Sequence, residues 1–154
     1  MAVVVAAAIG STLLYAGVGA AIGTVIAAMA GYALAKYEFR GREAIFNTIL
    51  AGVLVPATAL ALPLFLIFAA VGLTNTYWSV LLPSLVSPFG VYLSRIYASA
   101  SVPDALIEAA RLDGVGEFRI FLMMATALMK PALVTIFLFQ FVVIWNNFFL
   151  PLIM

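Results

Sequence analysis

The chain has 154 residues, of which 67% are hydrophobic and 8% charged, and its net charge is +1. Because a typical soluble domain contains roughly a quarter charged residues, this composition excludes a soluble protein and predicts an integral membrane protein. The chain has no Cys and no His. Disulfides, thiolate chemistry, His acid–base catalysis and most zinc sites are therefore excluded, and we expect no catalytic residue, no metal site and no cofactor.

The charged residues are confined to two windows. All seven basic and six acidic residues lie in 36–43 or 95–130, which leaves uncharged tracts at 1–35, 44–94 and 131–154. A helix needs about 20 residues to cross the hydrocarbon core. The sequence thus predicts an all-α, polytopic membrane helical bundle, one domain over 1–154. We place its four spans at about 3–35, 44–70, 77–97 and 131–153, and a charged loop at about 98–130.

The second and third spans are separated by a turn. Gly72 can end a helix, the next residues favour a turn, and Tyr77 and Trp78 suit the headgroup level of a membrane. With two spans between them, the two charged windows face the same side. They contain every Lys and Arg of the chain, so the positive-inside rule makes that side cytoplasmic. Both ends of the chain are then expected on the outer side.

The first span contains a ridge of small residues. Gly19, Gly23, Ala27 and Gly31 recur every four residues, so they lie on one face of a helix. Two interpretations are equally supported: this ridge packs closely against another helix, or it reflects the general abundance of small residues in membrane helices.

Prolines interrupt the second and third spans. Pro56 and Pro63 lie in the second, and Pro83 and Pro88 in the third. A proline inside a helix leaves a carbonyl without its usual partner and favours a kink. Such kinks occur both in transport passages and in static bundles.

The fourth span holds three amide side chains, Gln140, Asn146 and Asn147. Gln140 and Asn147 are seven residues apart, and we expect them on one helical face. An amide within a membrane faces either a protein interior or a water-filled path. For Gln140 the sequence favours a hydrogen bond between helices. For Asn146 and Asn147, nearer the outer mouth, it favours a place beside a translocation path.

The second charged window predicts a short cytoplasmic helix of about three turns. Ser101 can cap its start, Pro103 suits its first turn, Asp104 favours the helix dipole, and Asp113 with Gly114 can end it. One stripe of this helix is polar, and a second face is small and apolar. The stripe comprises Asp104, Glu108 and Arg111, and the second face comprises Leu106, Ala109 and Ala110. Such a helix can dock in the groove of a partner or lie on the membrane surface without one.

The stretch "EAARLDGVGEFRIF" (108–121) resembles the EAA loop of permease subunits in binding-protein-dependent ABC importers. That pattern is Glu-Ala-Ala, three residues, then Gly, and it corresponds to Glu108, Ala109, Ala110 and Gly114. Five stretches resemble the carbohydrate-importer branch, the maltose-permease type. They are "YALAKYEFRGRE", "GLTNTYW", "SVPDALIEAARLDG", "MKPAL" and "WNNFFLPL". The resemblance covers nearly the whole chain.

The resemblance implies a mechanism and a set of partners. The EAA loop of such importers forms a coupling helix that docks in a cleft of a cytoplasmic ATPase subunit. Glu108, Ala109, Ala110 and Gly114 would be the coupling residues, with Arg111 and Asp113 as supporting charges. The implied partners are two ATPase subunits, a second permease subunit (homologous or identical), an external sugar-binding protein and membrane lipid. The implied location is the cytoplasmic membrane of a bacterium or archaeon.

The chain departs from the family pattern in three ways. Met124, Thr126 and Ala127 stand where the pattern has an apolar residue and then Leu-Pro, and the missing proline predicts a straighter connection to the fourth span. The first and last of the six usual spans, and the tail, are not recognised in the sequence. Two alternatives therefore remain: a small helical scaffold or channel-like membrane protein working without an ATPase, or a non-functional truncated permease.

Three other classes of protein are disfavoured by what the sequence lacks. There is no Gly-x-Ser-x-Gly elbow for a hydrolase and no phosphate-binding loop, so ATP hydrolysis would belong to another chain. The basic residues are divided between two loops beside the membrane, so no nucleic-acid partner is expected.

Overall fold

The computed structural model describes residues 2–154, with side chains for 9–56 and 58–154, and every regular element in these residues is a helix. The α-helices are α1 (Ala2–Lys36), α2 (Arg42–Ala51), α3 (Ala61–Ala70), α4 (Tyr77–Ser84), α5 (Pro88–Ser101), α6 (Asp104–Leu112), α7 (Glu117–Ile120), α8 (Thr126–Leu128), α9 (Lys130–Trp145) and α10 (Phe149–Ile153). Two 3₁₀ turns, η1 (Gly52–Leu54) and η2 (Ala57–Leu60), and one π-helical turn, η3 (Phe121–Ala125), complete them. The predicted all-α class is confirmed.

Three of the four predicted spans coincide with long apolar helical segments. These segments are Ile9–Lys36, Tyr77–Ser101 and Lys130–Ile153, and each is long and apolar enough to cross a membrane. The predicted second span differs, because its halves Arg42–Leu54 and Thr58–Ala70 are bent by 96°. Counted as one broken span, this pair gives the predicted total of four.

Pro56 explains why the second span is broken. Val55 before it adopts an extended conformation (φ −80°, ψ 118°), as the residue before a proline prefers, and Pro56 itself is extended. Pro63 lies in the first turn of α3, where its missing N–H leaves no helical hydrogen bond unmade. The predicted kink is therefore large at Pro56, and Pro63 produces none.

The third span is divided between Ser84 and Pro88, at the junction of α4 and α5. Pro88 is the first residue of α5, where its fixed φ suits a helix start. The Ser87 hydroxyl caps this helix by accepting a hydrogen bond from the Gly90 N–H at 3.1 Å. A single helix predicted over 77–97 is thus two helices, and the second continues to Ser101.

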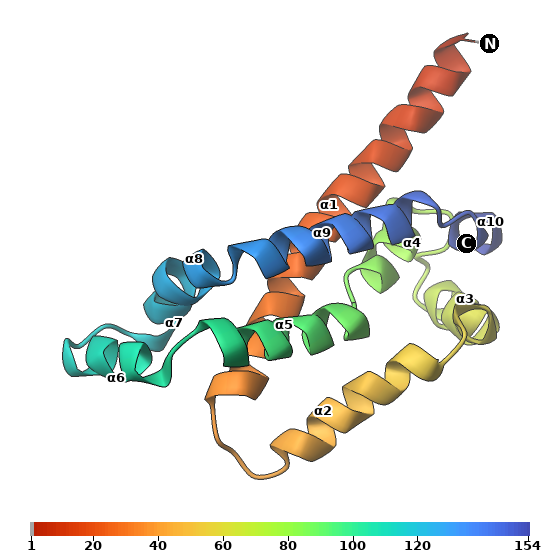
Figure 1. Cartoon of the computed structure of the whole chain (residues 1–154). Coiled ribbons are helices and arrows are strands. Elements are labelled where there is room, and N and C mark those ends of the chain that lie inside the picture. Colours follow the sequence, from red (N-terminus) through yellow and green to blue (C-terminus); the bar gives the residue numbers. More distant parts are fainter. Residues whose placement is uncertain (1) are drawn as a thin grey trace.

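Helix α1 is the centre of the packing, crossed by α5 and α9 (Figure 1). At Gly31 a Cβ atom would lie 2.3 Å from the Ser94 Cβ and 2.7 Å from the Arg95 backbone nitrogen. At Gly23 it would lie 1.9 Å from the Gln140 Nε2. The ridge of small residues therefore forms close helix contacts, and of the two interpretations the packing surface is confirmed.

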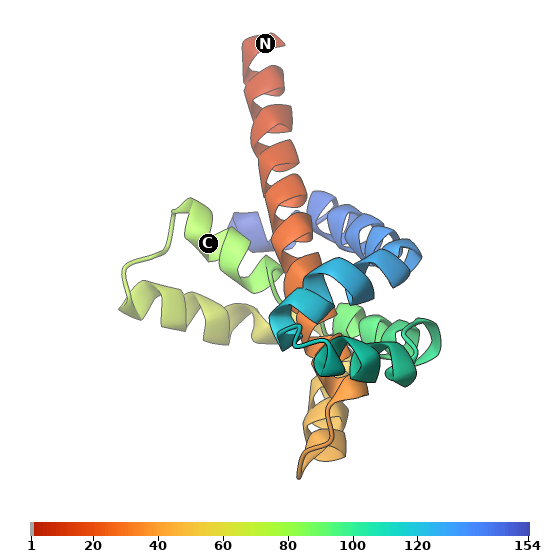
Figure 2. The same ribbon diagram turned by 90° about the vertical axis from the view of Figure 1, so that its left-hand side faces the viewer.

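The first part of α1 extends beyond the other helices (Figures 1 and 2). Among its described side chains, Ile9, Leu13 and Leu14 are apolar and exposed. Exposed apolar surface of this kind suits hydrocarbon rather than water.

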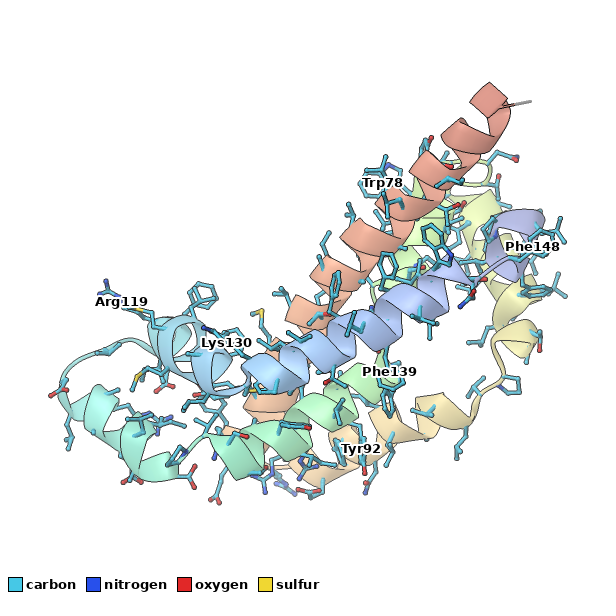
Figure 3. The ribbon with its side chains drawn as sticks, turned by 45° about the horizontal axis from the view of Figure 1, so that its top comes forward. Trp78, Tyr92, Arg119, Lys130, Phe139 and Phe148 are labelled. Atoms are coloured by element: carbon cyan, nitrogen blue, oxygen red, sulfur yellow. The ribbon has the colours of Figure 1, made fainter. Side chains whose placement is uncertain are left out.

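The two charged windows meet at one end of the molecule. Three hydrogen-bonded side-chain pairs join them: Lys36 with Asp104, Tyr37 with Glu117, and Arg95 with Glu43. Figure 3 places Arg119 and Lys130 at this end, away from Trp78 and Phe148. The two windows therefore lie together, as their predicted placement on one side of a membrane requires, and we call residues 36–43 and 95–130 the charged end.

Candidate functional site at the charged end

Helix α6 occupies the position predicted for the coupling helix, although its start differs. Ser101 was expected to cap it, but Ser101 is the last residue of α5. Helix α5 ends because of Pro103, since a proline disfavours the helical conformation of the residue before it. Val102 is accordingly extended (φ −109°, ψ 105°). Asp104 is consequently the first residue of α6, and the helix has nine residues, about two and a half turns rather than three.

The end of α6 agrees with the prediction. Gly114 has a positive φ of 77°. Its N–H donates to the Arg111 carbonyl at 3.0 Å, and the Val115 N–H donates to the Ala110 carbonyl at 2.9 Å. This pair of bonds is a Schellman motif, which favours glycine at its left-handed position. Gly114 therefore sets the turn that directs the chain into α7.

The inward face of α6 consists of Ile107 and Ala110. Both are buried in a cluster that includes Tyr32 of α1 and Phe121 of the following helix. Ala110, expected on a docking face beside Ala109, is only 5% exposed. The two alanines of the Glu-Ala-Ala triplet thus point in different directions, and only Ala109 is exposed.

The outward face of α6 consists of Ala105, Glu108, Ala109 and Leu112, all exposed. Leu112 is 90% exposed, the largest value among the large apolar side chains that the structure describes. We did not predict a role for Leu112 from the sequence, although an apolar residue three positions after Ala109 lies on the same helical face as that alanine.

Ion pairs along one flank of α6 connect it to its neighbours. Asp104 Oδ1 lies 2.7 Å from the Lys36 Nζ. Arg111 donates from Nε to Glu117 Oε1 at 2.6 Å and from Nη2 to Glu117 Oε2 at 3.2 Å. Of the predicted stripe, only Glu108 has no ion pair within the described residues.

A hydrogen-bonded group surrounds the carboxylate of Glu117. The hydrogen bond from Arg111, and then the one from the Tyr37 hydroxyl at 2.6 Å, hold the pKa of Glu117 below its ordinary value of 4.5. Burial, followed by the bond to Glu117, raises the pKa of Tyr37 to about 12. Glu117 is therefore an anion and Tyr37 a neutral donor at neutral pH.

The chain from α7 to α8 is helical without interruption. It includes Met124, Thr126 and Ala127, the residues at which this chain departs from the family pattern. The π-helical turn η3 precedes Thr126, whose hydroxyl donates to the Leu122 carbonyl at 2.6 Å. The predicted straighter connection to the fourth span stays a prediction, and much of the predicted loop 98–130 is helix.

Gln140 links three helices in the interior. It is 6% exposed, its Nε2 donates to the Ser84 carbonyl at 2.9 Å, and it lies against Gly23 of α1. The Ser84 carbonyl would normally accept from the residue four positions later, which is Pro88 and has no N–H. The favoured interpretation of Gln140, a hydrogen bond between helices, agrees with this geometry.

Asn146 and Asn147 do not share a helical face with Gln140. Helix α9 ends at Trp145, and Asn147 lies in the turn before α10. The Asn147 Oδ1 accepts from the Leu150 N–H at 3.1 Å, and the Asn146 Nδ2 donates to the Val142 carbonyl at 2.9 Å. The expectation of one shared face was wrong because α9 ends at Trp145, less than two turns after Gln140.

Residues 19–154 match the family described as the binding-protein-dependent transport system inner membrane component. The chain belongs to this family. It is a membrane-embedded, multi-pass permease component.

Individual relatives agree with this assignment. The arabinooligosaccharides transport system permease protein AraQ of Halalkalibacterium halodurans is 40% identical over 129 residues, 84% of this chain and 46% of the relative. AraQ of Bacillus subtilis is 42% identical over 125 residues, which cover 81% of this chain and 44% of the relative. The lactose transport system permease protein LacG of Rhizobium radiobacter is 34% identical over 136 residues, which cover 88% of this chain and 50% of the relative. The chain thus spans about half the length of these curated relatives.

Proposed function

We propose that this chain acts as a membrane-spanning permease subunit of an ABC importer and couples its motions to ATP hydrolysis in a separate subunit through α6. One observation supports this role above the others. The outward face of α6 is a small apolar surface carrying one acid, Glu108, that has no ion pair within the described residues, and the opposite face and one flank of the helix are already engaged. A surface of this kind suits the groove of a partner protein.

A sugar or sugar derivative is the proposed solute. The relatives' printed names include arabinooligosaccharides, lactose and melibiose. Amide side chains can hydrogen-bond sugar hydroxyls, so Asn146 and Asn147 are proposed to approach the path of the solute, whereas Gln140 is engaged between helices. An external solute-binding protein and a second permease subunit, identical or homologous, would complete the importer.

The proposed orientation puts the charged end in the cytoplasm. All seven Lys and Arg residues belong to it, which the positive-inside rule associates with the cytoplasmic side. Helix α6 would then face the compartment that contains ATP, and both ends of the chain would lie on the outer side of the membrane.

Co-purification with the ATPase subunit of the same organism tests this proposal. We expect a tagged chain to retain the ATPase in detergent, and Leu112→Asp to lose it because a charge replaces the most exposed apolar contact. Phe39→Asp is the matched control, since Phe39 is also exposed at the charged end but lies outside α6. Equal retention by both variants would contradict docking through α6.

A further inference from the structure

The end of α1 contacts both ends of α6. Lys36 is the last residue of α1, and its partner Asp104 is the first residue of α6. The Lys36 side chain is 5% exposed, whereas that of Asp104 is 77% exposed. An ammonium group removed from water requires a compensating charge, so Lys36 is committed to the start of α6.

The next residue of the chain reaches the other end of α6. The Tyr37 N–H still donates to the Ala33 carbonyl at 3.1 Å, which fixes Tyr37 to the last turn of α1. Its hydroxyl donates to Glu117, the residue that also binds Arg111 in the last turn of α6. The Arg111 guanidinium lies 5.9 Å from the centre of the Tyr37 ring, so the three side chains form a closed group.

Two separate attachments fix the direction of a helix as well as its position. Asp104 and Arg111 are seven residues apart, which corresponds to roughly 10 Å along the axis of α6. Between them, Ile107 and Ala110 pack into the same cluster as Tyr32 of α1. A single attachment would leave α6 free to swing about one end, whereas two prevent this.

We propose that Lys36 and Tyr37 are positioning residues that clamp α6 to α1, so that a displacement of α6 moves α1 as part of the same rigid unit. This role rests on the proposed function, because it requires a partner that displaces α6. The close contacts of Gly31 with α5 and of Gly23 with α9 then pass the movement of α1 to the other spans. We call Lys36, Tyr37, Asp104, Arg111 and Glu117 the clamp.

The test measures the distance between α1 and the α6–α7 corner in the complex with the ATPase. Nitroxide labels are attached to cysteines introduced at Met29 and Phe118, both exposed and both outside the clamp. This chain has no native Cys, so no other site of this chain is labelled. Distances are recorded without nucleotide and after trapping with ATP and vanadate.

For the parent chain we expect the same narrow distance distribution in both states, because the clamp keeps the two labels in one unit. For Lys36→Met/Tyr37→Phe we expect a distribution that shifts or broadens on trapping. A purely structural role would alter both states equally. The matched control is Lys130→Met/Tyr77→Phe, which makes the same chemical changes at exposed residues outside the clamp, and it should behave as the parent.

Each contrary outcome has a separate meaning. A parent complex that contains no ATPase would refute the proposed function and the clamp's role with it. A parent that shifts on trapping, or a clamp variant that stays as narrow and unmoved as the parent, would refute the clamp alone. If the double variant does not fold, the single variant Tyr37→Phe is used in its place, because it removes only one hydroxyl. Tyr77→Phe is then the control.

Discussion

The hydroxyl of Tyr37 illustrates how a single hydrogen bond at the charged end depends on pH. Folding raises the pKa of Tyr37 from 10.0 to about 12, so its contribution to stability is present below pH 10 and lost as the pH rises through about 12. Folding lowers the pKa of Glu117 from 4.5, so its contribution is present above that value and lost as the pH falls through the lower one. Arg111 faces both groups, and Tyr32 also faces Tyr37. Between these limits the bond should not change.

Absorbance of the phenolate tests this prediction at residue 37. The difference between the parent and Tyr37→Phe isolates one of the six tyrosines. We expect that tyrosine to stay mostly un-ionised at about pH 11, where a free tyrosine is mostly ionised. A midpoint near 10 would show that the hydroxyl is solvated and makes no bond to Glu117.

Backbone constraints at single residues were predictable only where one residue type decides the conformation. Gly114 was assigned correctly because a left-handed helix end strongly favours glycine. Ser101 was assigned wrongly because serine is compatible with both a cap and a helix interior, and Pro103 determined the outcome.

At the scale of elements, the ridge on α1 decides how closely the spans pack. We expect Gly31→Ala to destabilise the fold by about 1–3 kcal/mol, since the new methyl group would meet the backbone of α5. Gly17→Ala is the matched control on the same helix. A Cβ there meets nothing within 4 Å, so the change should be neutral or stabilising by about 0.5–1 kcal/mol.

Unfolding of both variants in mixed micelles, followed by the loss of helical circular dichroism, checks the difference. Equal stabilities for Gly31→Ala and Gly17→Ala would show that α1 and α5 are not in close contact at Gly31.

The lengths of the spans were predictable from the sequence, but their interruptions were predicted only in part. Uncharged tracts set the limits of a span, and the predicted 3–35 lies within α1. A proline has different effects at different positions of a helix: Pro56 breaks the second span, whereas Pro63 fits the first turn of α3. Which position a proline occupies depends on where tertiary packing starts the helix.

The faces of α6 were also only partly predictable. Helical spacing grouped Ala109 with Ala110, but a nine-residue helix offers only two or three turns from which to identify its buried side. The cluster that buries Ala110 includes Ala28 and Tyr32 of α1, distant in sequence, together with residues between 98 and 129. A large separation in sequence also concealed the roles of Lys36, Tyr37 and Glu117. Lys36 lies 68 residues before its partner Asp104, and Tyr37 lies 80 residues before its partner Glu117.

At the scale of the whole molecule, the charges explain the arrangement of the spans. Thirteen charges would be costly in hydrocarbon, so both windows gather at one end, where they pair with one another. That arrangement leaves the outward face of α6 exposed. We propose that this face meets an ATPase subunit.

Cysteine crosslinking from the two neighbouring alanines of the Glu-Ala-Ala triplet tests this contact between α6 and the ATPase subunit. Ala109 is exposed and Ala110 is 5% exposed, so the two positions differ in direction but not in chemistry. The chain, carrying one cysteine at either position, is co-expressed with the ATPase and treated with a short thiol-to-amine crosslinker. We predict a crosslinked product from Ala109→Cys and little or none from Ala110→Cys. No product from Ala109→Cys, with both proteins folded and present in the membrane, would contradict docking through α6.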